Sequence, residues 1–212
     1  MHLHLPPVYP ITDKTLSDKA SHLAILRELA RGGACWVQIR DKTTPVRELL
    51  ADLLHCVDYA AKNRIVLIID DRCDLVMSSG AAGVHLGQLD LPPAAARRIL
   101  GPDMIIGYST HTPAQVRKAQ RLPVDYIGFG PIFATATKDN PGRVVGLMGL
   151  KRACAASRKP VVAIGGIDPP QIADVLRAGA ASAGVISAIM NSNNIARQME
   201  RLLKAATALA QM

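Results

Sequence analysis

The chain has 212 residues, of which 49% are hydrophobic but only 3% aromatic, and it carries a formal net charge of +8. This length fits one large domain whose interior is filled by aliphatic side chains. Basic residues are scattered and aromatic stacking residues are scarce, so we expect small anionic metabolites rather than nucleic acid as partners. No apolar run approaches the ~20 residues that cross a bilayer, so no membrane partner is expected.

The four cysteines form no C-x-x-C pair. The first residues also lack the basic and apolar regions of a secretory signal. Free thiols in a reducing compartment, and hence a cytoplasmic location, are expected.

Apolar, β-rich runs alternate with helical patterns along the whole chain. The expected strands are 8–12, 35–40, 65–70, 83–86, 104–109, 126–130, 160–165 and 184–188. The expected helices are 18–31, 45–62, 72–79, 93–100, 113–121, 147–157, 169–178 and 192–210. Strict alternation favours parallel strands joined by right-handed crossovers. We therefore predict an α/β fold over residues 1–212, a single domain closed into one (β/α)8 TIM barrel.

An open doubly wound sheet is the rival architecture. Its dinucleotide-binding fingerprint is missing, because Gly128-x-Gly130 is followed by Pro131 and Phe133 instead of a third glycine. The barrel is therefore preferred, and its active site is expected at the C-terminal ends of the strands.

The second expected strand ends in W-V-Q-I-R-D-K. Because side chains alternate along a strand, Gln38, Arg40 and Lys42 share the face toward the barrel mouth. Val37 and Ile39 then face the helices. Two cations on one face repel each other unless an anion lies between them, so this strand end predicts an anion site.

Two carboxylates follow the third and fourth expected strands. Asp71 lies in I-I-D-D-R and Asp90 in H-L-G-Q-L-D. Each alone is explained as a helix N-cap. Together, on neighbouring strands, they suit Mg²⁺ whose shell is completed by phosphate oxygens and water.

The sixth expected strand opens into a long loop with Thr135, Thr137 and Lys138. Two hydroxyls beside an ammonium suit a phosphate ester, although an isolated T-x-T-K is also typical of a solvated loop. Ser109, at the end of the fifth strand, adds a further donor. His111 fits either a general acid or base or a loop residue.

The last two expected strands end in A-I-G-G-I-D and V-I-S-A-I. The loops after strands seven and eight form the usual phosphate site of such barrels. We expect Gly166, Ile186 and Ser187 to make a phosphate cradle there.

These stretches together resemble the thiamine phosphate synthase family. The matching pieces, in family order, are Y-P-I-T-D, Q-I-R-D-K, I-I-D-D-R, G-V-H-L-G-Q-L-D, G-Y-S-T-H-T, Y-I-G-F-G-P-I-F-A-T-A-T-K, A-I-G-G-I and V-I-S-A-I. The resemblance implies a barrel enzyme that joins a hydroxymethylpyrimidine diphosphate to a plain or carboxylated thiazole phosphate. Pyrophosphate leaves with the help of Mg²⁺, and thiamine phosphate is formed.

The resemblance also assigns roles to residues. It implies that the pyrimidine diphosphate is bound by Gln38, Ile39, Arg40, Asp41, Lys42, Asp70, Ser109 and Lys138. Within that set, the catalytic residues are Arg40, Lys42, Lys138 and Ser109. It implies that Mg²⁺ is bound by Asp71 and Asp90. The implied thiazole phosphate site consists of Thr135, Ala136, Thr137, Gly166, Ile186 and Ser187.

One position departs from the family pattern, because Asp70 stands where an Asn is expected. A carboxylate repels pyrophosphate unless it is protonated, turned toward Arg72 or recruited by the metal.

The implied reaction starts with ionisation at the pyrimidine methylene. Mg²⁺, Arg40, Lys42 and Lys138 neutralise the departing pyrophosphate before the thiazole nitrogen captures the cation.

Two other functions stay open. One is a thiazole tautomerase of the same fold that would use His111. The other is a non-catalytic barrel that binds thiamine precursors, which Asp70 favours. The C-terminal helix, with an apolar stripe through Leu202, Leu203, Ala206 and Leu209, either closes the barrel or contacts a second copy in a homo-oligomer.

Overall fold

The computed structural model describes residues 3–135, 137 and 142–207. A single sheet of eight parallel strands, in the order β1-β8-β7-β6-β5-β4-β3-β2, forms the centre. The strands are β1 (Val8–Pro10), β2 (Trp36–Ile39), β3 (Val66–Asp70), β4 (Gly83–Leu86), β5 (Ile105–Thr110), β6 (Tyr126–Phe129), β7 (Val161–Ile164) and β8 (Ser182–Val185).

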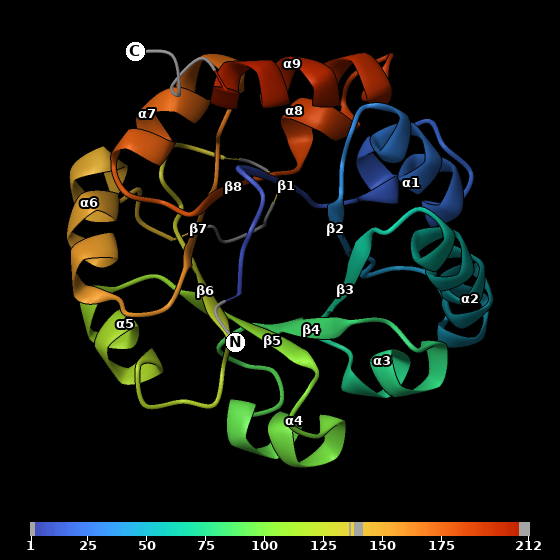
Figure 1. The fold of residues 1–212 in the computed structure, drawn as a ribbon, viewed down its shortest axis with the longest axis horizontal. Coiled ribbons are helices and arrows are strands. Elements are labelled where there is room, and N and C mark those ends of the chain that lie inside the picture. The colour runs from blue at the N-terminus through green and yellow to red at the C-terminus, as the bar shows by residue number, and fades with distance from the viewer. Residues whose placement is uncertain (1–2, 136, 138–141, 208–212) are drawn as a thin grey trace.

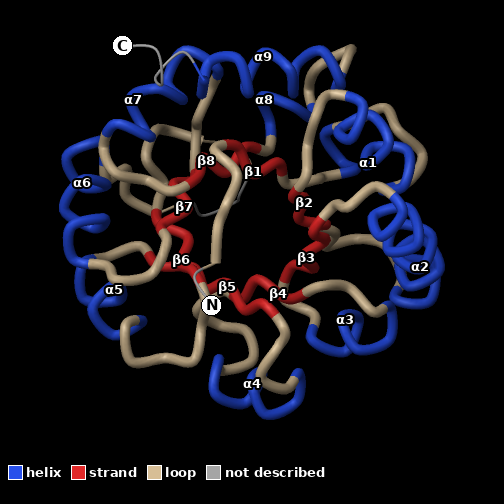
Figure 2. The backbone as a smooth tube through the Cα atoms, viewed as in Figure 1, coloured by secondary structure: helices blue, strands red, loops and turns tan. Residues whose placement is uncertain are grey.

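The two edge strands of this sheet meet and close it. Ile11 bridges Gln38 in parallel, and the Thr12 N–H donates to the Gln38 carbonyl at 2.9 Å. Figure 1 shows the resulting ring of strands, and Figure 2 shows the helices surrounding it. The predicted single (β/α)8 barrel is confirmed.

The outer ring consists of α1 (His22–Arg31), α2 (Val46–Lys62), α3 (Cys73–Ser79), α4 (Pro93–Leu100), α5 (Pro113–Ala119), α6 (Gly146–Ala156), α7 (Ile172–Arg177), α8 (Ser187–Met190) and α9 (Ile195–Thr207). Short 3-10 turns, η1 (Lys14–Leu16) and η2 (Pro169–Gln171), precede α1 and α7. Within the described ranges, no helix has the length and apolar character to cross a bilayer.

Two apolar clusters stabilise the barrel. The larger one lies between the sheet and the helices. The smaller one fills the barrel interior with Leu5, Tyr9, Trp36, Ile68, Tyr126 and Val162. Leu5 belongs to the segment before β1, which crosses the barrel opening in Figure 1. Apolar side chains therefore fill the interior near the start of the strands.

The end of the expected strand 184–188 is wrong. The strand β8 spans Ser182–Val185, and Ser187 begins the short helix α8, which the sequence had not suggested. The small residues at the start of β8 give no strand pattern in the sequence. The V-I-S-A-I run, in contrast, has the apolar pattern of a strand and therefore predicts that the strand continues through it. The expected helix 192–210 appears as α9, and Leu209 of its stripe lies outside the described residues.

Candidate active site

A cavity of about 410 Å³ opens at the C-terminal ends of the strands. Its walls include the predicted residues Gln38, Arg40, Lys42, Asp70, Asp71, Asp90 and Ser109. The expected shared face of Gln38, Arg40 and Lys42 is thus confirmed. Ile39, which was assigned to the substrate, is instead 2% exposed and packs in the outer core between sheet and helices.

Carboxylates neutralise the two cations, Arg40 and Lys42, that line the cavity among the described residues. Arg40 contacts Asp13, and its Nε lies 3.8 Å from Asp70 Oδ2. Lys42 Nζ lies 3.0 Å from Asp70 Oδ2 and also contacts Asp71. The repulsion that suggested an anion between Arg40 and Lys42 is therefore already relieved by the protein.

The orientation of Asp70 differs from one of the arrangements expected from the sequence. Its carboxylate lies near Arg40 and Lys42, whereas Arg72 pairs with Asp74, with Nε 2.8 Å from Oδ1. Asp74 competes successfully because it is only two residues from Arg72 on the exposed start of α3. The carboxylate of Asp70 is thus held beside the cations of the site.

Asp41 lies within the β2–α2 loop and not on the wall of the main cavity. Its side chain accepts the Thr43 N–H at 2.9 Å and the Thr44 N–H at 2.8 Å. Burial raises the pKa of Asp41, but the hydrogen bonds from Thr44, Thr43 and His22 outweigh it and hold that pKa well below its usual range. Asp41 lines a neighbouring hollow of about 130 Å³ with Lys14, and Arg40 and Lys42 line both this hollow and the main cavity. Its assignment to the diphosphate is not supported by a position in the main cavity.

Asp71 and Asp90 both line the main cavity and neither caps a helix. The caps of α3 and α4 are Arg72 and Pro92. Asp71 has a left-handed φ of 60°, and its N–H donates to the His85 carbonyl at 2.8 Å. Asp90 accepts the Gly87 N–H at 2.7 Å. The simple N-cap explanation of these residues is therefore wrong.

The donor set of Asp71 and Asp90 fits Mg²⁺. Carboxylate oxygens are its preferred protein ligands, and it commonly uses one or two of them beside phosphate oxygens and water. In the part of the chain that the structure describes, no group of three or more His, Cys, Asp or Glu side chains gathers to hold a metal. An ion here would therefore depend on substrate and water for the rest of its shell.

A hydrogen-bonded network forms the floor of the cavity, and sequence reasoning missed it. The two ring nitrogens of His85 lie 3.0 Å from Tyr126 Oη and 2.9 Å from Ser109 Oγ. Tyr126 Oη lies 2.9 Å from Tyr9 Oη. Burial raises the pKa of both tyrosines, so their hydroxyls stay protonated. The alternation of β1, β4 and β6 was the signal that could have placed these side chains inside.

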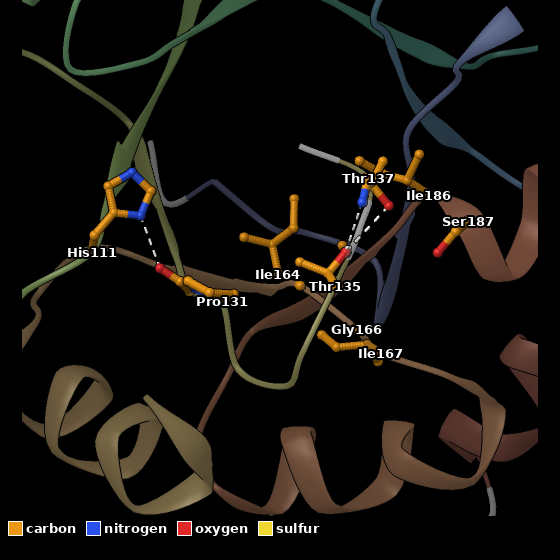
Figure 3. Close-up of a pocket in the computed structure, with 12 residues that line it drawn as sticks. His111, Pro131, Thr135, Thr137, Ile164, Gly166, Ile167, Ile186 and Ser187 are labelled. Atoms are coloured by element: carbon orange, nitrogen blue, oxygen red, sulfur yellow. Dashed lines mark hydrogen bonds between the residues drawn. The ribbon is translucent and has the colours of Figure 1, made fainter. Parts of the chain in front are cut away.

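A second pocket has a volume of about 50 Å³ (Figure 3). Its walls bring together the predicted Thr135, Thr137, Gly166, Ile186 and Ser187. Thr135 Oγ1 donates to Thr137 Oγ1 at 3.2 Å. The predicted Ala136 and Lys138 lie outside the described residues.

His111 lines both pockets. Its Nδ1 lies 2.8 Å from the Gly130 carbonyl (Figure 3). A carbonyl oxygen only accepts hydrogen bonds, so Nδ1 carries a proton. Ile164 and Ile186 also line both pockets, and the two spaces therefore share a wall.

Comparison with known proteins identifies the family. The family model described as thiamine monophosphate synthase matches residues 8–189. The chain belongs to this family. The thiamine-phosphate synthase of Chloroflexus aurantiacus is 39% identical over 199 residues, 92% of each chain. Thiamine-phosphate synthase 1 of Aquifex aeolicus is 37% identical and covers 93% of this chain and 92% of its own.

A solved structure also supports membership of the thiamine monophosphate synthase family. The thiamine phosphate pyrophosphorylase of Pyrococcus furiosus superposes with a TM-score of 0.87 at 33% identity. The match covers 95% of this chain and 96% of that one. The resemblance noted from the sequence motifs is confirmed.

Proposed function

We propose that this chain is a thiamine phosphate synthase, which joins a hydroxymethylpyrimidine diphosphate to a thiazole phosphate and releases pyrophosphate. The observation that carries the proposal is the shared wall of the two pockets, formed by His111, Ile164 and Ile186. One pocket is rich in charge, as a diphosphate site requires. The other offers apolar side chains, two threonine hydroxyls and glycine backbone, which suit a small phosphorylated ring.

The main cavity supplies the groups that would stabilise the leaving pyrophosphate. Arg40 and Lys42 face it at the end of β2, and we assign Lys138 to the same role. Gln38 and Ser109 add polar groups deeper in the barrel, where the pyrimidine would lie. Because carboxylates already orient Arg40 and Lys42, little reorganisation is needed as charge develops on the leaving group.

The charges of the cavity also support a role for Mg²⁺ at Asp71 and Asp90. Its three carboxylates, Asp70, Asp71 and Asp90, outnumber the two described cations Arg40 and Lys42. A diphosphate entering this set alone would meet a net negative site. A bound divalent ion supplies Lewis-acid stabilisation of the phosphate oxygens.

The reaction that fits these groups needs no protein nucleophile. The bond between the pyrimidine methylene carbon and the diphosphate oxygen breaks, and its electron pair leaves with the pyrophosphate. The lone pair of the thiazole nitrogen then forms the new bond to that carbon. Arg40 and Lys42 hold the leaving group on one side, while Thr135, Gly166 and Ser187 hold the thiazole phosphate on the other.

The first test is pyrophosphate release by the purified protein given both phosphorylated precursors with Mg²⁺, repeated with EDTA. We expect release that requires both precursors, yields thiamine phosphate and stops when the metal is removed. Release without thiamine phosphate, or none at all, would contradict the synthase assignment. Unchanged release in EDTA would remove the role given to Mg²⁺.

A thiazole tautomerase is the second candidate, because His111 lies on the wall shared by the two pockets. Incubating the carboxylated thiazole phosphate alone and following its isomers by NMR tests this activity. No isomerisation by the unmutated protein would end this candidate.

A further inference from the structure

A buried histidine connects the first turn of α1 to the loop that carries the cations of the site. His22 is 0% exposed, as is Thr12, which follows β1. Thr12 Oγ1 lies 2.9 Å from His22 Nδ1, and His22 Nε2 lies 2.9 Å from Asp41 Oδ2. The ring is thus clamped between two elements at the point where β1 and β2 close the barrel.

The donor and the acceptor can be assigned for each hydrogen bond in the series that links Arg40, Thr12, His22 and Asp41. Asp41 remains a carboxylate and only accepts, so His22 Nε2 carries the proton. Burial lowers the pKa of His22, so the ring is neutral and Nδ1 accepts from the Thr12 hydroxyl. The Thr12 oxygen in turn accepts the Arg40 N–H at 3.2 Å. The imidazole therefore serves as an acceptor on one side and as a donor on the other.

Two hydrogen-bonded arms lead from His22, one through Thr12 and one through Asp41, and both end on the segment 40–44. One arm reaches the backbone of Arg40 through Thr12. The other reaches Asp41, which holds the N–H groups of Thr43 and Thr44. Lys42 lies between these attachment points. Hydrogen bonds to Thr12 and Asp41 thus fix the backbone that presents Arg40 and Lys42 to the main cavity.

The histidine itself is anchored from a third element. The backbone N–H of His22 donates to Asp52 Oδ2 at 2.6 Å, and the backbone N–H of Leu23 donates to Asp52 Oδ1 at 3.2 Å. Asp52 belongs to α2, the helix that follows the cation-bearing loop. A shift of the loop would therefore have to move α1 and α2 together.

We propose that His22 is a positioning residue, which holds the segment 40–44 so that Arg40 and Lys42 meet the diphosphate. His22 lines none of the described pockets. The proposal rests on the proposed synthase function, since it concerns the diphosphate half of that site. It predicts that damage to His22 affects diphosphate binding and its departure but spares the thiazole phosphate pocket.

Two substitutions separate the arms. The amide of His22→Asn can still accept from Thr12 but is too short to reach Asp41, whereas that of His22→Gln can still donate to Asp41. His55→Gln makes the same chemical change on the exposed face of α2 and is the control. Each protein is assayed for kcat and for KM of both substrates, for calorimetric binding of inorganic pyrophosphate with Mg²⁺, and for melting temperature.

We expect His22→Asn to lower kcat/KM for the pyrimidine diphosphate about 10-fold to 100-fold, since small misplacements of catalytic groups have such costs. Pyrophosphate binding should weaken with it, while KM for the thiazole phosphate stays within about twofold of the unmutated value. His22→Gln should recover most of the loss, and His55→Gln should match the unmutated protein.

Equal losses for both substrates in step with a lower melting temperature would overturn the proposal in favour of a purely structural role. Normal kcat/KM and normal pyrophosphate binding in His22→Asn would overturn it as well. If His22→Asn does not fold, Thr12→Val against Thr12→Ser tests the other arm by the same measurements. Failure of the synthase function would appear separately, as absence of thiamine phosphate formation by the unmutated protein, and pyrophosphate binding would still test the positioning role.

Discussion

At the level of single residues, the carboxylate of Asp70 has two opposite effects on the cations of this site. Its carboxylate lies 3.0 Å from Lys42 Nζ and 3.8 Å from Arg40 Nε, inside the cavity that we assign to the diphosphate. It therefore orients the two cations and also competes with the substrate for them. An Asn could keep the first effect through its carbonyl oxygen and would lose most of the second.

We predict that Asp70→Asn lowers KM for the pyrimidine diphosphate about fivefold, because a like charge near the phosphates costs about 1 kcal/mol or more. Steady-state kinetics and calorimetry with inorganic pyrophosphate measure this effect. Asp74→Asn removes the same charge from exposed α3, where Asp74 pairs with Arg72, and should leave KM unchanged. A higher KM in Asp70→Asn would mean that orienting Lys42 matters more than the repulsion.

Single residues also mark how far the sequence could predict this site. Alternation along β2 placed Gln38, Arg40 and Lys42 correctly, because strand geometry alone decides which face a side chain takes. The assignment of Asp41 to the diphosphate came from the family resemblance instead, and its side chain is held by Thr44 and by His22 of α1. Partners that only tertiary folding brings together leave no periodic signal.

At the level of elements, the junction after β7 lies between the two pockets, because Ile164 lines both. The Ile132 N–H donates to the Ile164 carbonyl at 2.9 Å, and the Phe133 N–H donates to the Gly165 carbonyl at 3.0 Å. Gly166 has a φ of 62°, and a Cβ there would lie 2.2 Å from the Ala134 carbonyl oxygen. A glycine is therefore required where the β6 loop packs against the end of β7.

We predict that Gly166→Ala raises KM for the thiazole phosphate at least about tenfold, because the loop must move away from the pocket. Diphosphate affinity, measured with inorganic pyrophosphate, should change little. Gly101→Ala is the control, since Gly101 also has a positive φ of 81° but no atom lies within 4 Å of its added Cβ. That control should only lower stability, by about 1 kcal/mol. Equal kinetic effects of the two changes would refute the steric explanation.

The elements also show which parts of the fold the sequence could predict. The first seven strands and the main helices follow from alternation and length, and their centres agree with the structure, whereas the expected strand 184–188 only overlaps the end of β8. The short helix α8 did not follow, because the four residues Ser187–Met190 carry no helical period. Its start depends on where β8 ends, and the pairing of β8 with β1 and β7 decides that.

At the scale of the whole molecule, closure of the barrel and the net charge act on both substrates at once. The contact between β1 and β2 brings Thr12 beneath Arg40, so the closure of the sheet also forms the cation site. Beyond the cavity, the formal charge of +8 includes exposed cations on α5 and α6, such as Lys118 and Lys151. A positively charged molecule attracts anionic substrates over distances greater than any contact in the site.

This attraction predicts that kcat/KM for both substrates falls about threefold to tenfold when ionic strength rises from about 0.01 M to 0.15 M, while kcat stays constant. The Debye length shrinks over that range from about 30 Å to 8 Å, which removes steering but leaves contacts in the cavity. Kinetics in KCl at saturating Mg²⁺ measure the slope. The double variant Lys118→Gln, Lys151→Gln should flatten that slope without changing kcat, since neither residue lines a described pocket. An unchanged slope would place the whole attraction in the cavity charges themselves.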